Sequence, residues 1–133
     1  MKKYEKFSSH LETLKKAPGE DLHNEFIISG IIDKFSIQFE LGWKVFKELL
    51  LQEGDSAGKT GSPRDIIKAA YKYYSFMDEE VWLKMLRDRN NTTYIYDGDE
   101  AVKLVHRILE EYIPAFVRTD QGLRERYGEM LWK

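Results

Sequence analysis

The sequence has no cysteine, only three prolines and no long apolar run. The absence of cysteine excludes disulfides, thiolate metal sites and a cysteine nucleophile. No segment approaches the roughly 20 apolar residues that a membrane-spanning helix needs, and no apolar stretch follows residues 1–6 as it would in a secretory signal. We therefore expect a cytoplasmic protein with no membrane association.

The charge is also close to balanced, with 21 Lys and Arg against 23 Asp and Glu and a formal net charge of -2. Nonspecific nucleic-acid binding comes mostly from neutralising phosphates with Lys and Arg, so a protein that coats nucleic acid is disfavoured. An apolar fraction of 42% with 33% charged residues is typical of helices with solvated faces. The length fits one domain, and we assign residues 1–133 to it.

Apolar residues recur at helical spacing through nearly the whole chain. The longest pattern predicts a helix over about residues 22–52. Shorter patterns predict helices from Tyr4 to before Pro18-Gly19, from Ser62 to Tyr74, from Asp78 onward, and from Asp99 to Pro114, with helical spacing continuing to Leu131. Pro114 is expected to kink or end its helix. No strand pattern of comparable quality occurs, so we predict an all-α, up-and-down bundle of four or five helices.

Two loops contain residues that resemble phosphate or metal sites. Residues 54–60 end in Gly-Lys-Thr, as a P-loop does, but the spacing is one residue short and a helix is predicted before it in place of a strand. Asp97-Gly98-Asp99-Glu100 resembles the Asp-x-Asp metal site of nucleotidyltransferases, yet capping accounts for acidic residues at a helix N-terminus. We favour an ordinary interhelical loop in the first case and a helix cap in the second.

The histidines give no indication of a metal centre. His10, His23 and His106 lie in different predicted elements, without the i, i+4 pairing that would place two ligands on one helix face. No metal and no other cofactor is therefore predicted.

An aromatic cluster ends the predicted helix that begins at Ser62. It consists of Tyr71, Tyr73, Tyr74 and Phe76. Such side chains can stack on bases, but packing between helices explains Tyr71 and Tyr74 more simply. This leaves Tyr73 as the exposed candidate.

The polar segment from Arg89 to Asp97 is the most informative part of the chain. Its residues 90–93, Asn-Asn-Thr-Thr, are poor in a helix interior because their side chains compete for backbone hydrogen bonds, so one interpretation is a helix terminus. In the other, the helix persists and Arg89 and Tyr96, seven residues apart, share a face that Tyr94 flanks. That surface suits a phosphate-bearing ligand, because arginine offers a planar fork to phosphate oxygens.

At these residues the sequence resembles the HEPN superfamily, and more closely the nucleotidyltransferase substrate-binding proteins related to HepT-type toxins. The resembling segments, in chain order, are residues 39–44, 61–65, 81–83 with 87–90, and 94–97. The resemblance extends over about residues 27–116. It implies a homodimeric helical bundle that pairs with a small nucleotidyltransferase encoded nearby, as in toxin-antitoxin systems.

The resemblance also implies roles for single residues. Ribonuclease members of the superfamily carry an arginine followed by a histidine: the arginine holds the phosphate that the 2'-hydroxyl attacks, and the histidine moves a proton, without a metal. The partner nucleotidyltransferase adds AMP to the tyrosine two residues after that histidine, which corresponds to Tyr96. Here Tyr94 stands at the histidine position. With an unperturbed pKa near 10, a tyrosine is only about 0.1% ionised at pH 7.

Our leading hypothesis is therefore a substrate-binding or partner subunit of a small nucleotidyltransferase, which presents a substrate, or itself, to that enzyme and has little or no nuclease activity of its own. Arg89 would hold a phosphate of RNA or a nucleotide, Asn90 and Thr93 would position it, and Tyr96 would accept AMP. The alternative is a metal-independent endoribonuclease toxin that uses Arg89 with Tyr94 or Tyr96 and is controlled by AMP addition. A third possibility is a dimeric bundle with a role in assembly alone.

Overall fold

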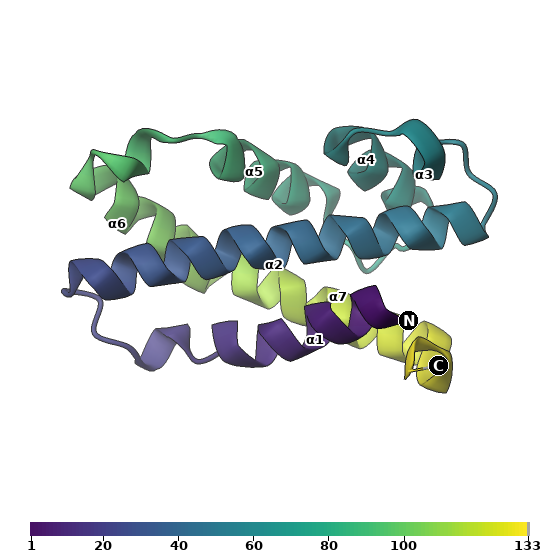
Figure 1. Cartoon of the computed structure of the whole chain (residues 1–133), viewed down its shortest axis with the longest axis horizontal. Helices are drawn as coiled ribbons and strands as arrows, with labels where there is room; N and C mark the ends of the chain where they lie inside the picture. Colours follow the sequence, from purple (N-terminus) through teal and green to yellow (C-terminus); the bar gives the residue numbers. More distant parts are fainter. Residues whose placement is uncertain (133) are drawn as a thin grey trace.

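The computed structural model describes residues 1–132 as a bundle of helices, with no strand in that range (Figure 1). The helices are α1 (Lys2–Leu14), α2 (Glu25–Gln52), α3 (Ala57–Thr60), α4 (Pro63–Tyr73), α5 (Glu79–Asn90), α6 (Gly98–Arg107) and α7 (Ile113–Tyr127). Short 3-10 turns lie at Ala17–Gly19, Thr93–Ile95 and Gly128–Trp132, and a π-helical turn lies at Ile108–Tyr112. The predicted all-α bundle is confirmed.

Helix α2, 28 residues long, is the element around which the others pack. It contacts α1, α3, α4, α5 and α6, and Figure 1 shows it running the length of the molecule. It begins later than the predicted residue 22, because the Asn24 side chain caps it by accepting from the backbone N–H groups of Phe26 and Ile27. This contact satisfies donors that the first helical turn leaves open.

The helix starts that we predicted from capping residues are confirmed. Ser62 and Asp65 form a capping box at the start of α4, with Pro63 at its first position. The Asp97 carboxylate accepts from the backbone N–H groups of Asp99 and Glu100 at the start of α6, at 3.0 and 3.2 Å. Capping therefore accounts for the acidic cluster that resembled a metal site.

The segment that resembled a P-loop packs against α2. Its Gly58 lies in the short helix α3, where a Cβ atom would be 2.7 Å from the backbone nitrogen of Leu51. Glycine permits this close approach of two backbones. The segment is thus a packed connection between α2 and α4, which agrees with the interhelical loop that we favoured but adds a turn of helix.

The predicted break at Pro114 does not end the helix. Backbone angles remain helical from α6 through the π-helical turn into α7, with ψ of -48° at both Ile108 and Ile113. A proline lacks an N–H and its ring crowds the carbonyl four residues earlier. The wider π-helical turn directly before Pro114 accommodates it, so α6 and α7 form one continuous helical segment.

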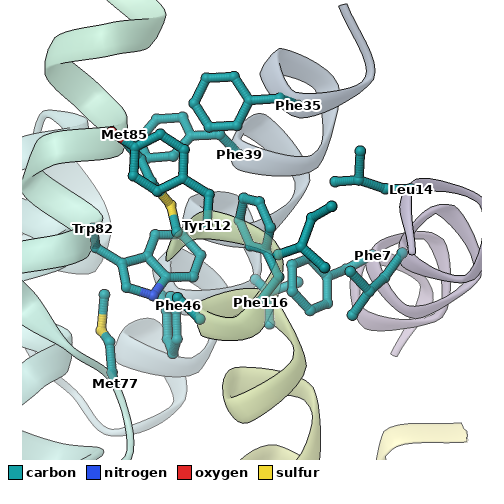
Figure 2. Close-up of a cluster of buried hydrophobic side chains, with 14 of the residues drawn as sticks. Phe7, Leu14, Phe35, Phe39, Phe46, Met77, Trp82, Met85, Tyr112 and Phe116 are labelled. Atoms are coloured by element: carbon teal, nitrogen blue, oxygen red, sulfur yellow. The ribbon is translucent and has the colours of Figure 1, made fainter. Parts of the chain in front are cut away.

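Aromatic side chains from four parts of the chain fill the core (Figure 2). The Trp82 ring on α5 lies 5.9 Å from Phe39, 5.5 Å from Phe46 and 5.4 Å from Phe116, measured between ring centroids. Trp82 reaches α2 because Gly42 has no side chain: a Cβ atom there would lie 2.6 Å from Cη2 of the indole. This packing fixes α5, whose last turn carries Arg89, against α2.

Candidate functional site

The segment from Arg89 to Asp97 is a helix end followed by a turn. Helix α5 ends at Asn90, a 3-10 turn covers Thr93–Ile95, and Asp97 then caps α6. The Asn91 side-chain oxygen accepts from the backbone N–H of Thr93 at 3.0 Å and from its hydroxyl at 2.7 Å. The helix-terminus interpretation is confirmed, and the expectation that one helix face carries both ends of the segment is wrong.

Arg89 is held by side chains of α2. Its guanidinium donates to the Glu40 carboxylate and lies over the Phe39 ring, 5.4 Å from the ring centroid. About a quarter of the Arg89 side chain is exposed, and Lys44 Nζ lies 3.7 Å from the other carboxylate oxygen of Glu40. An anion that binds Arg89 must therefore compete with a fixed carboxylate.

Glu40 was not identified from the sequence. It lies within the resembling segment 39–44, but nothing in its spacing indicates a partner 49 residues away. The only signal is an acidic residue directly after the core residue Phe39 on the predicted long helix. That signal is shared by many solvated helix positions, so the pairing required the fold.

Removal of the Glu40 charge is expected to strengthen anion binding at Arg89. The pair is partly solvent-exposed, so it is worth about 0.2–1 kcal/mol, and Glu40→Gln should raise the affinity for an RNA oligonucleotide by up to about fivefold. Fluorescence anisotropy measures this. Glu48→Gln, eight residues further along the same helix, makes the same charge change away from Arg89 and should have a smaller effect. Weaker binding by Glu40→Gln would contradict this role of Glu40.

Asp88, directly before Arg89, is buried and was also not identified from the sequence. Its carboxylate accepts from Arg107 Nε at 2.8 Å and Nη2 at 3.2 Å, and from the hydroxyl of Tyr112. Burial, followed by the bond to Asp88, raises the pKa of Tyr112 well above its usual value. Burial alone would lower the pKa of Arg107, but the hydrogen bond and charge of Asp88 outweigh it and raise that pKa.

Tyr94 lies beside this buried network. A small pocket between α5 and α6 is lined by Asp88, Asn91, Tyr94, Glu100, Leu104 and Arg107. None of the three histidines is among these lining residues in the described part of the chain. The polar groups that line this pocket with the Tyr94 phenol are thus an amide, two carboxylates and a guanidinium.

Tyr96 projects from the turn between α5 and α6, with 80% of its surface exposed. The neighbouring Ile95 is 70% exposed, and Asn90 is exposed as well. The Tyr96 side chain is therefore open to a second protein or to a nucleotide. Tyr96 is thus open to solvent, whereas Arg89 is held by Glu40 and Phe39.

The other candidates lie apart from this segment. His10 on α1 contacts the Gln38 side chain at 2.6 Å, whereas His23 and His106 are exposed. Within the described residues no group of three His, Cys, Asp or Glu side chains could hold a metal ion. The same range contains no helix with the length and apolar character to cross a membrane.

The aromatic cluster on α4 is arranged differently from our prediction. Tyr74 is fully buried, as expected, and Tyr73 donates to the Asp55 carboxylate at 3.1 Å. Tyr71 is the exposed member, at 46%. The prediction that packing buries Tyr71 and leaves Tyr73 exposed is wrong, because Tyr73 bonds to the loop that follows α2.

Two comparisons with known proteins bear on the family of this chain. The family described as "Nucleotidyltransferase substrate binding protein like" matches residues 1–125, which take in the bundle from α1 to most of α7. A Haemophilus influenzae protein named "Probable ribonuclease HepT" is 30% identical over 103 residues. That match covers 75% of this chain and 69% of the relative.

Proposed function

This chain belongs to the nucleotidyltransferase substrate-binding-protein-like family, a HepT-like part of the HEPN superfamily, and on that premise we propose that it is the helical partner subunit of a small nucleotidyltransferase. In this role it binds the enzyme and presents the segment from Arg89 to Tyr96, with little or no nuclease activity of its own. The family description supports the nucleotidyltransferase partner.

The observation that carries this proposal is the set of groups around the segment. Arg89 supplies a guanidinium for phosphate, Tyr96 supplies an open phenol, and Tyr94 stands where the superfamily's ribonucleases have their histidine. Near neutral pH a phenol is a weaker general base than the imidazole of histidine. The surface thus retains groups for binding and modification but not an efficient proton shuttle.

Arg89, Asn90 and Thr93 together form the proposed phosphate-binding group. Asn90 is exposed at the end of α5 and can donate from its side-chain amide. The Thr93 hydroxyl bonds to Asn91 and thereby fixes the turn that leads to Tyr94. Arg89 must exchange part of its contact with Glu40 for the ligand, which favours a ligand that carries negative charge.

Homodimer formation is part of this proposal. Phe26, Ile37 and Leu51 of α2 are 81%, 49% and 45% exposed, and apolar side chains gathered on one long helix are consistent with a covered face. Sedimentation equilibrium of the purified protein tests it: a dimer is expected, and a monomer at high concentration contradicts this part.

Tyr96 is expected to accept one AMP from the partner nucleotidyltransferase. The phenolic oxygen attacks the α-phosphorus of ATP, pyrophosphate leaves, and the phenolic proton passes to solvent. Intact-mass measurement after incubation with the enzyme, ATP and Mg²⁺ should show the addition of one AMP to the unmodified sequence and none to Tyr96→Phe. Tyr71→Phe, which removes another exposed phenol, is the matched control and should still be modified.

Two results would exclude this acceptor role. The first is no mass increase although the two proteins form a complex. The second is an equal mass increase in Tyr96→Phe, since AMP would then be attached elsewhere.

The second candidate function is a metal-independent endoribonuclease. The name of the Haemophilus influenzae relative favours it, and Arg89 is retained in this chain. In this reaction the 2'-hydroxyl attacks the adjacent phosphorus, the 5'-oxygen of the next nucleotide leaves, and Tyr94 has to take part in proton transfer. AMP on Tyr96 would then control the activity.

A further inference from the structure

A buried carboxylate lies directly beside Arg89 and is not needed to hold phosphate. Asp88 is 3% exposed and belongs to the last turn of α5. A negative charge at a helix C-terminus is disfavoured by the helix dipole, and burial removes it from water. Arg107 and Tyr112 compensate these costs by donating three hydrogen bonds to the carboxylate.

The π-helical turn brings these two donors to one carboxylate. Arg107 and Tyr112 are five residues apart, which in a regular α-helix places them about 140° apart around the axis. In a π-helical turn the repeat widens toward i, i+5, so residues five apart come close to the same face. The turn covers residues Ile108–Tyr112, and it therefore aligns the guanidinium and the phenol toward α5.

The network links Arg89 to the pocket that contains Tyr94. Asp88 precedes Arg89 in the chain, and Asp88, Arg107 and Tyr94 line the same pocket. Well-packed apolar residues of similar volume often stabilise a fold as well as a buried ion pair does. Unlike apolar packing, the contacts of this network are directional: its hydrogen bonds fix the rotation of the last turn of α5 about the helix axis.

We propose that Asp88, Arg107 and Tyr112 are positioning residues for Arg89: they lock the C-terminal turn of α5 against the π-helical turn and so aim the guanidinium at the phosphate of a bound RNA. This inference rests on the proposed phosphate-binding role of Arg89. It adds three residues to the site, none of which touches the ligand.

A second network of the same chemistry provides an internal control. Between the start of α1 and α7, Tyr4 donates to Asp120 at 2.6 Å and Arg124 donates to the same carboxylate at 3.1 Å. Tyr4 is fully buried, and burial followed by the bond to Asp120 raises its pKa to about 12. Tyr4→Phe and Tyr112→Phe thus remove equivalent hydrogen bonds, one far from Arg89 and one beside it.

The experiment measures the binding of a short fluorescein-labelled single-stranded RNA. The proteins compared are the unmodified sequence, the single variants Arg89→Ala, Tyr112→Phe and Tyr4→Phe, and the double variant that combines Arg89→Ala with Tyr112→Phe. Tyr112→Phe should weaken binding about tenfold, since small misplacements of an aligned group have large effects, and Tyr4→Phe should leave it unchanged. In the Arg89→Ala background Tyr112→Phe should have no further effect. Circular dichroism confirms that each variant is folded.

Equal RNA affinities of Tyr112→Phe and Tyr4→Phe, with a clear loss in Arg89→Ala, would overturn this inference and leave the proposed function intact. Unchanged binding by Arg89→Ala would instead contradict the proposed function. In that case the Nε–H resonance of Arg89 in a proton-nitrogen NMR spectrum decides the inference. A shift in Tyr112→Phe but not in Tyr4→Phe supports positioning, and an unmoved resonance contradicts it.

Discussion

Tyr94→His is expected to cleave single-stranded RNA without metal about 10²–10⁴ times faster than the unmodified sequence. The substitution replaces a phenol by an imidazole, the side chain that serves most often as a general base near neutral pH. The fraction of usable base at pH 7 then rises by roughly three orders of magnitude. In the proposed function Arg89 holds the phosphate, so the only group that the substitution supplies is the proton shuttle.

Gel analysis of a labelled RNA in the presence of a chelator measures this gain. Tyr94→Phe is the matched control, because it changes the same ring without adding a base, and Tyr94→His combined with Arg89→Ala tests whether the gain depends on the guanidinium. If the imidazole acts as the base, the rate should rise as the pH passes about 6.5. Equal inactivity of Tyr94→His and Tyr94→Phe would show that the site lacks more than a proton shuttle.

Trp82→Ala is expected to lower the free energy of unfolding by about 3–5 kcal/mol. The indole is fully buried among Phe39, Phe46 and Phe116 (Figure 2). Its N–H finds no acceptor in the described part of the chain. The loss therefore comes from packing alone, and it should loosen the contact of α5 with α2 that sets the position of the site.

Urea denaturation monitored by circular dichroism measures this loss. Trp82→Phe keeps most of the packing and removes the unbonded N–H, so it should be much less destabilising than Trp82→Ala. Trp132→Ala is the exposed comparison: that ring is 49% exposed and packs edge-on against Tyr4 at 5.5 Å, so its loss should stay below about 1.5 kcal/mol. Similar losses for Trp82→Ala and Trp132→Ala would contradict the central place of Trp82 in the core.

The fold was predictable because local signals and the global arrangement agree. Helical spacing and caps such as Ser62 located the helices to within a few residues, since capping side chains act on backbone groups of the same turn. Pro114, which was expected to kink or end its helix, does not end it: the π-helical turn before it accommodates the proline, and this depends on contacts that the local sequence does not contain. Tyr73, which was predicted to be the exposed member of the aromatic cluster, is instead bonded to Asp55. That partner lies eighteen residues away in the chain, so the local sequence does not indicate it.

The candidate site was predictable only in part. The segment from Arg89 to Tyr96 was located from its polarity and from the family resemblance, and the exposure of Tyr96 suits the predicted acceptor role. Glu40 and the partners of Asp88 could not be found in this way, because they reach the segment from α2 and from the π-helical turn. Ion pairs between distant helices leave no periodic signal, whereas caps and apolar stripes do.

The Glu40 carboxylate holds the Arg89 guanidinium in place and neutralises part of its charge. This arrangement fits a surface that takes up an anionic ligand with modest affinity, or one that is completed when a partner protein binds. Tyr96 lies seven residues further along the chain, in the turn between α5 and α6. A nucleotidyltransferase that modifies Tyr96 would thus act on the segment that also carries Arg89.

The central claim, that this chain retains a phosphate-binding arginine without an efficient proton shuttle, is tested most directly by incubating the unmodified protein and Arg89→Ala with labelled RNA in the absence of metal. We predict that both leave the RNA intact to the same extent over the time in which Tyr94→His cleaves it. Cleavage by the unmodified protein that is lost in Arg89→Ala would contradict the claim and identify the protein as an active ribonuclease.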